Sequence, residues 1–122
     1  PNIDILIVDD NSPDKTGDVI KQYQNNYNNL FLVSRSGKEG LDSAHKIGFK
    51  FAKEKNYENL ITIDADLSHD PQMIPQFLKT LDDKPFVIGS RYMKGATNDM
   101  KLFRYTLSYV GNKVIKFMDQ IF

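Results

Sequence analysis

Cysteine is absent from the 122-residue chain, which excludes disulfide bonds, thiolate metal sites and thiol catalysis. Net charge is absent too, because 16 Lys and Arg balance 16 Asp and Glu. That balance gives no global field for nucleic acid, so we predict no nucleic-acid partner. No apolar run approaches the ~18 residues of a membrane span, and no internal repeat is visible. What remains is an ordinary globular composition, 40% hydrophobic and 26% charged.

Short β-branched apolar runs alternate with amphipathic stretches along the chain. The apolar runs predict strands at residues 3–8, 30–34, 60–63 and 86–89. Helical spacing predicts helices at residues 19–27, 41–52, 75–81 and 102–118, with a turn at 71–74 that accommodates the two prolines. This alternation indicates an α/β fold with a parallel sheet and right-handed crossovers. We expect one domain over residues 1–122, cut from a longer protein, because the chain enters a strand at once and ends within a helix.

Acidic residues follow two of the four predicted strands. Asp9 and Asp10 end the first strand, and Asp64 and Asp66 end the third. In extended backbone, positions two apart point to the same side, so Asp64 and Asp66 can face one spot, with the small Ala65 leaving room for a ligand. Parallel strands bring both acidic clusters to the same edge, where open α/β sheets bind ligands. Two close carboxylates call for a cation, and Mg²⁺ suits two carboxylates plus substrate phosphates.

Each of these features also has a purely structural interpretation. A lone D-x-D is more often an Asp-rich turn than a metal site. For Asp10, hydrogen bonding to a nucleoside and a turn role weigh about equally, whereas turn and cap roles are favoured for Asp9 and Asp14. Gly37 and Gly40 precede a helix and would let a phosphate approach it, but a plain loop is the favoured interpretation.

Basic side chains follow the fourth predicted strand. Arg91 lies at the functional edge, where its planar guanidinium suits phosphate. For Lys94, Lys101 and Arg104, a solvated surface role weighs as much as phosphate binding. His69 lies near the acidic pair, but two lone histidines do not predict a zinc site.

Four stretches taken together resemble a known family, in its order and over essentially the whole chain. Residues 8–16, 37–41, 64–71 and 89–92 are similar to the family 2 GT-A glycosyltransferases, especially the dolichyl/polyprenyl-phosphate mannosyltransferase branch. The resemblance implies a GT-A (Rossmann-like) fold, a three-layer α/β/α sandwich with a mainly parallel central sheet, here truncated. It implies an inverting transfer of a hexose, mannose from GDP-mannose, to a polyprenyl (dolichyl) phosphate at the cytoplasmic face of a membrane.

The resemblance also implies a cofactor, Mg²⁺ or Mn²⁺, and a set of site residues. These are Val8 and Asp10 on the nucleoside; Asp64, Ala65 and Asp66 on nucleotide and diphosphate; Asp64 and Asp66 on the metal; and Asp66, Arg91 and Arg104 in catalysis, with both arginines on phosphate groups.

The chain departs from the family pattern at several places. Ser68 stands where some members carry a metal-binding Gln, and Asp42 and His45 replace a common Gly and Tyr. The opening strand and the acceptor-side segments are expected to be missing. Three alternatives stay open: another donor such as UDP-glucose or a saccharide acceptor, a nucleotidyltransferase, and a non-catalytic nucleotide-binding module. For the basic, aromatic helix at 102–118, peripheral membrane contact and packing against protein are both open.

Overall fold

The structure is a computed structural model that describes residues 3–66, 68–82, 84–90 and 102–118. The chain divides into two compact units, Pro1–Lys79 and Thr80–Phe122, and each is described by itself. The expectation of one domain over residues 1–122 stays a prediction.

The first unit is built on a two-stranded parallel sheet. Strand β1 (Ile5–Asp9) pairs with β2 (Leu30–Ser34), in a register that sets Ile5 beside Leu30 and Asp9 beside Ser34. Helix α1 (Thr16–Gln24) connects the two strands, and α2 (Leu41–Glu54) follows β2. The two apolar runs therefore form the strands that the sequence predicts, joined by the helical crossover that parallel pairing requires.

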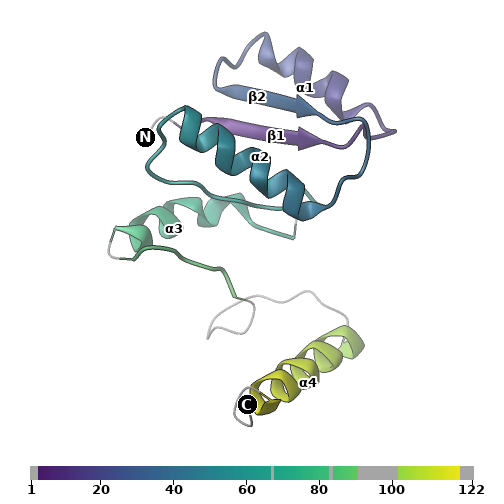
Figure 1. The fold of residues 1–122 in the computed structure, drawn as a ribbon, viewed down its shortest axis with the longest axis vertical. Helices are drawn as coiled ribbons and strands as arrows, with labels where there is room; N and C mark the ends of the chain where they lie inside the picture. The colour runs from purple at the N-terminus through teal and green to yellow at the C-terminus, as the bar shows by residue number, and fades with distance from the viewer. Residues whose placement is uncertain (1–2, 67, 83, 91–101, 119–122) are drawn as a thin grey trace. The chain divides into compact units, whose positions relative to one another are not determined.

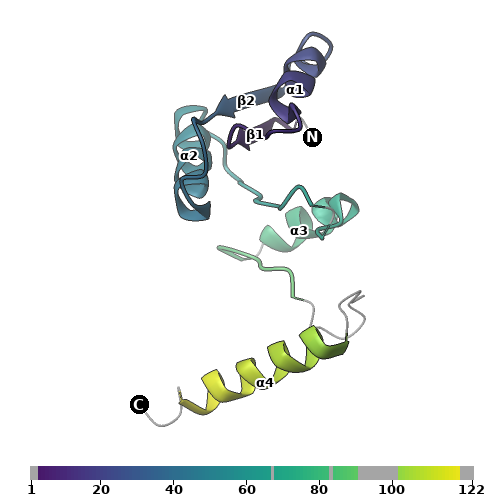
Figure 2. The same cartoon turned by 90° about the vertical axis from the view of Figure 1, so that its right-hand side faces the viewer.

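The two helices cover opposite faces of this sheet, as the two views show (Figures 1 and 2). Successive strand residues point to opposite faces. On one face, Asp9 and Ser34 lie next to Gly17 of α1, and on the other the ring of Phe31 lies 5.0 Å from that of Phe51 in α2. The α/β/α layering that the resemblance implies is confirmed for this unit, and the fold is of the α/β class.

Two of the four predicted strands are wrong for the described residues. Residues 60–63 and 86–89 carry no strand, and the described sheet contains β1 and β2 only. Leu60, Ile63, Phe86 and Ile88 are 41%, 47%, 69% and 71% exposed. An apolar run shows that a segment suits a buried strand, but a ladder also needs a neighbouring strand and covering side chains, which are not local properties.

The later helices follow the sequence prediction closely. A 3₁₀ turn at Pro71–Met73 leads into α3 (Ile74–Leu81), and Asp70 caps it by accepting a 2.9 Å hydrogen bond from the Gln72 amide. Proline thus lies in the first turn of each short segment, where its missing N–H costs nothing. Helix α4 (Leu102–Met118) has the predicted bounds. Among the described residues, none of the helices combines the length and apolarity needed to cross a bilayer.

Candidate functional site

The carboxyl ends of β1 and β2 meet at one edge of the sheet. The backbone amide of Arg35 donates a 2.8 Å hydrogen bond to the carbonyl of Asp9, which carries the ladder one residue past β2. Asp10 and Arg35, the first residues after the two strands, therefore lie side by side. This is the edge at which open α/β sheets bind ligands.

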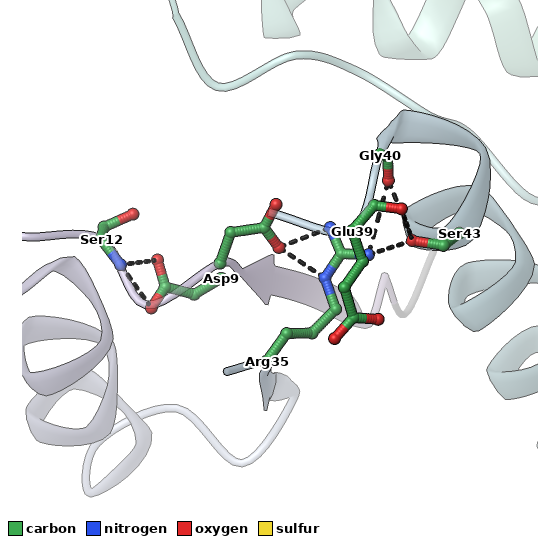
Figure 3. A network of polar contacts seen from close by, with 7 residues as sticks. Asp9, Ser12, Arg35, Glu39, Gly40 and Ser43 are labelled. Carbon is green, nitrogen blue, oxygen red and sulfur yellow. Dashed lines mark hydrogen bonds and ion pairs between the residues drawn. The ribbon is translucent and has the colours of Figure 1, made fainter. Parts of the chain in front are cut away.

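Asp9 faces α1 and serves the loop between β1 and that helix. It is 7% exposed, and both of its carboxylate oxygens lie 3.4 Å from the Ser12 amide, which donates to them. Figure 3 shows this carboxylate turned away from Arg35 and toward Ser12. The turn role that the sequence favours for Asp9 is confirmed.

Asp14 has the predicted cap role in the same loop. Its Oδ1 accepts hydrogen bonds from the Thr16 amide at 3.0 Å and from the Thr16 hydroxyl at 2.6 Å, at the first residue of α1. The hydroxyl bond, followed by the amide bond, holds the pKa of Asp14 below its ordinary value. Lys15, at φ 63°, takes the N-cap place without a side-chain bond, so Asp14 satisfies the helix start instead.

Asp10 faces the opposite way, toward α2, and pairs with Arg35. The Nε and Nη2 atoms of Arg35 both lie 2.5 Å from Oδ1 of Asp10. The Arg35 side chain is 6% exposed and the Asp10 side chain 28% exposed. The structure thus gives Asp10 a partner of opposite charge, while leaving part of its carboxylate toward solvent.

The other end of the guanidinium reaches the start of α2. Nη1 of Arg35 donates to the Ser43 hydroxyl oxygen and, at 3.5 Å, to the Gly40 carbonyl (Figure 3). Gly40, the N-cap residue of α2, has φ 88°, and a Cβ there would lie 2.8 Å from Oδ1 of Asp42. A glycine is required at this position by backbone conformation, which accords with the plain-loop interpretation of this glycine.

The Asp64–Ala65–Asp66 segment is an exposed turn that is held by hydrogen bonds with Ser68 and His69. Oδ1 of Asp66 accepts a 2.9 Å bond from the Ser68 amide. Hydrogen bonds from Ser68, the side-chain bond first and the backbone bond second, lower the pKa of Asp66. These bonds favour the ionised carboxylate, the form that binds a metal ion.

His69 folds back onto the same turn. The Asp64 amide donates a 2.8 Å hydrogen bond to Nδ1 of His69. Nδ1 also lies 3.9 Å from Oδ2 of Asp64, a contact that is an ion pair only if the ring is protonated. The two arrangements are exclusive at Nδ1, and the shorter bond requires Nδ1 to be an acceptor, which puts the proton of the neutral ring on Nε2.

The acidic pair fits part of a divalent-cation site. Within the described residues, no three His, Asp or Glu side chains gather into a complete set of ligands. Asp64 and Asp66 are both exposed and supply carboxylate oxygens, the donors that Mg²⁺ and Mn²⁺ prefer. Two carboxylates are also the usual protein share of a Mg²⁺ site completed by substrate phosphates and water.

The structure describes three of the four remaining predicted site residues. Val8 is half-buried on the same face of β1 as Asp10, and Ala65 is exposed between the two acids. Arg104 is exposed on α4, in the second unit. Arg91 lies outside the described residues. The roles given to all of them stay predictions.

Arg35 is the site residue that sequence reasoning missed. An arginine in a loop with serine and glycine suggests a solvated side chain, yet only 6% of this side chain is exposed. The signal was its position: Arg35 follows β2 as Asp10 follows β1, and the two strands are parallel neighbours. Opposite charges at matching strand ends predict a pair.

Comparison with known proteins identifies the family. The family described as "Glycosyl transferase family 2" matches residues 1–120. The chain belongs to glycosyl transferase family 2. This membership accounts for the α/β fold, of the GT-A class, and confirms the resemblance drawn from the four sequence stretches. No solved structure gives a significant match to the chain.

Three curated relatives of this family 2 chain show the branch that it resembles. It is 38% identical to an undecaprenyl-phosphate mannosyltransferase of Micrococcus luteus over 78% of the chain and 39% of the relative. It is 37% identical to a dolichol-phosphate mannosyltransferase of Mycosarcoma maydis over 80% of the chain and 33% of the relative. A polyprenol monophosphomannose synthase of Mycolicibacterium smegmatis is 33% identical over 97% of the chain and 46% of the relative. The chain spans less than half the length of each of these relatives.

Proposed function

We propose that the full-length protein is an inverting glycosyltransferase that moves mannose from GDP-mannose to a polyprenyl phosphate. The observation that carries this proposal is the likeness, over most of the chain, to several relatives whose names all join mannose to a polyprenyl-type lipid phosphate. GDP as the nucleotide carrier is our extension from the family resemblance.

The acidic turn is the proposed site for the donor's diphosphate. Asp64 and Asp66 would hold Mg²⁺ or Mn²⁺, and the small Ala65 lets the diphosphate approach the turn. A bound divalent ion supplies Lewis-acid neutralisation of the charge on the leaving nucleoside diphosphate. The exposure of both acids supports this role, because it leaves their carboxylate oxygens accessible to a metal ion and to the donor.

The end of β1 is the proposed nucleoside contact. Val8 and Asp10 lie two residues apart in and just after one strand, so they face the same side. An aliphatic side chain beside a carboxylate suits a nucleoside, which has an apolar face and donor groups at its edge. Arg91 and Arg104 would neutralise phosphate groups of donor and acceptor.

A lipid phosphate as acceptor requires no general base from this chain. It is already anionic at neutral pH, whereas a sugar hydroxyl needs a base to take its proton. Attack opposite the leaving diphosphate inverts the configuration at the sugar carbon. The proposed place is the cytoplasmic face of a membrane, with α4 in peripheral contact. Its exposed Phe103 and Leu107, 77% and 64% exposed, flank the cationic Arg104.

A donor and acceptor panel tests this function. The full-length protein is incubated with radiolabelled GDP-mannose or UDP-glucose and with polyprenyl phosphate or a saccharide, and lipid products are extracted. We expect label in the lipid phase only with GDP-mannose and polyprenyl phosphate. Transfer from UDP-glucose or onto a saccharide would assign another family 2 reaction. Pyrophosphate release from a nucleoside triphosphate would indicate a nucleotidyltransferase, and nucleotide binding without turnover would indicate a binding module.

The metal role has its own test in Asp66→Asn. This change keeps the shape of the side chain but removes the charge, so transfer should fall by about 100-fold or more at saturating Mg²⁺. Glu58→Gln is the matched control, since it neutralises an exposed carboxylate that lies a few residues before the turn in the sequence. A chelator should abolish wild-type transfer, and Mg²⁺ or Mn²⁺ should restore it. Metal-dependent turnover that persists in Asp66→Asn would remove Asp66 from the metal site.

A further inference from the structure

Arg35 is a buried cation that joins three segments at the ligand-binding edge of the sheet. With 6% of its side chain exposed, its guanidinium bonds to Asp10 after β1, to Gly40 at the end of the loop and to Ser43 in the first turn of α2. Figure 3 shows the guanidinium reaching across from the end of β2 to that first turn. A charge with this little exposure must be compensated, and Asp10 compensates it.

Arg35 contacts only Oδ1 of Asp10, so the carboxylate can still bind a ligand through its other oxygen. The hydrogen bond from Nε and the ion-pair contact of Nη2, each 2.5 Å, both go to Oδ1. A carboxylate has about four lone-pair sites on its two oxygens, so the Oδ2 side of Asp10 keeps its accepting capacity. The Asp10 side chain is 28% exposed, which gives a ligand access to it. Arg35 also cancels the charge of Asp10, so that the pair would not repel an anionic nucleoside diphosphate.

The far end of Arg35 is itself held firmly. The Ser43 hydroxyl accepts from Arg35, and its single hydrogen is directed at the carbonyls of Glu39 at 2.9 Å and Gly40 at 3.0 Å. The guanidinium is therefore fixed at one end by α2, and its planar fork fixes the carboxylate at the other. Lysine has a single point charge in place of this fork and cannot hold both ends at once.

We propose that Arg35 is a positioning residue for nucleoside binding: anchored on the first turn of α2, it holds Asp10 through Oδ1 and turns Oδ2 toward the donor's nucleoside. The proposal rests on the proposed function, and it deepens that function by naming the residue through which Asp10 is oriented. Arg35 acts through Asp10 and does not itself touch the substrate.

A double-mutant cycle in the full-length protein tests this role, with GDP binding measured by calorimetry and GDP-mannose turnover measured in parallel. Arg35→Gln should weaken GDP binding and raise the donor KM by about tenfold, with a smaller effect on kcat. Arg35→Lys should fall between Arg35→Gln and wild type. Lys38→Gln is the matched control, because it removes the same charge from an exposed side chain of the same loop and should leave GDP binding unchanged.

The decisive comparison is made in the Asp10→Asn background. If Arg35 acts through Asp10, Arg35→Gln should have little further effect on GDP binding there, because interacting residues are not additive. Full additivity of the two changes would overturn the proposal, as would a kcat loss without a change in GDP affinity. Circular dichroism of each variant identifies unfolding, and the Arg35→Lys variant carries the test if Arg35→Gln unfolds. Failure of the wild type to bind GDP would overturn the proposed function itself, a result distinct from additivity.

Discussion

Replacing Gly17 with alanine should destabilise the protein, against the usual direction of a Gly→Ala change in a helix. Gly17 is the second residue of α1, and its position lies against the buried end of β1. A Cβ placed there would lie 3.1 Å from Oδ2 of Asp9, 3.8 Å from its Cγ and 3.9 Å from the Ser34 hydroxyl oxygen. The first of these contacts is tighter than most real Cβ contacts, so Asp9 would have to withdraw by a few tenths of an ångström.

The magnitude follows from two opposing effects. Alanine in place of glycine stabilises a helix by roughly 0.5–1 kcal/mol, because the unfolded chain loses less entropy. Overpacking costs roughly 1–3 kcal/mol when the neighbour cannot withdraw freely. Asp9 is 7% exposed, and its withdrawal would break its bonds with the Ser12 amide. We therefore expect a net loss of about 1 kcal/mol in the free energy of unfolding.

Gly48→Ala is the matched control within the same unit. Gly48 lies in the middle of α2, and a Cβ there would have no neighbour within 4 Å. This change should stabilise the protein by about 0.5–1 kcal/mol. Urea denaturation of the full-length protein would measure both variants, with the midpoints compared at an unchanged m-value. If Gly17→Ala stabilises as much as Gly48→Ala, the packing of Asp9 against α1 is wrong.

Two further predictions concern the acidic turn at His69 and the loop between β1 and α1. His69→Asn keeps an acceptor near the place of Nδ1 and should preserve the bond from the Asp64 amide, whereas His69→Gln moves the acceptor toward the place of Nε2. The rate of steady-state transfer should fall about threefold to tenfold in His69→Gln and less in His69→Asn. Equal losses in the two variants would contradict the role of Nδ1. For Asp14, the Thr16 bonds lower the folded pKa, so its contribution to stability is complete above the ordinary value of 3.8 and is lost as the pH falls through the lower folded value. Asp14→Asn should flatten that acid limb of the unfolding midpoint measured against pH, and an unchanged limb would contradict it.

The parts of the fold that the sequence predicts correctly are those set by local pattern. The apolar runs of β1 and β2 mark their strands to within a residue or two, and the helical spacing of α4 gives its bounds. Pro71 and Pro75 correctly divide the later segment into a 3₁₀ turn and a helix. Each of these features depends on residues a few positions apart, which a sequence displays directly.

The errors arise where distant parts of the chain decide the outcome. Residues 60–63 have the composition of a buried strand, but a ladder requires bonds to another strand, and composition does not supply the partner. Arg35 was missed for the same reason. Its burial depends on the return of α2 over the end of the sheet, which brings Ser43 within reach of the guanidinium.

The adjacent carboxylates of Asp9 and Asp10 show how far a local rule reaches once the fold is known. They have the same chemistry, but the two-residue period of a strand sends them to opposite faces. Asp9 faces α1, where it is buried and its carboxylate accepts a hydrogen bond from a loop amide, so this side chain has a structural role. Asp10 faces α2, where Arg35 takes Oδ1 alone and part of the side chain stays exposed. The two acids cannot exchange roles, because moving either to the other face would require a one-residue shift of the whole strand against β2, which would also turn its apolar side chains to the wrong faces. The register of the sheet therefore fixes which of the two acids is structural and which is available to a ligand.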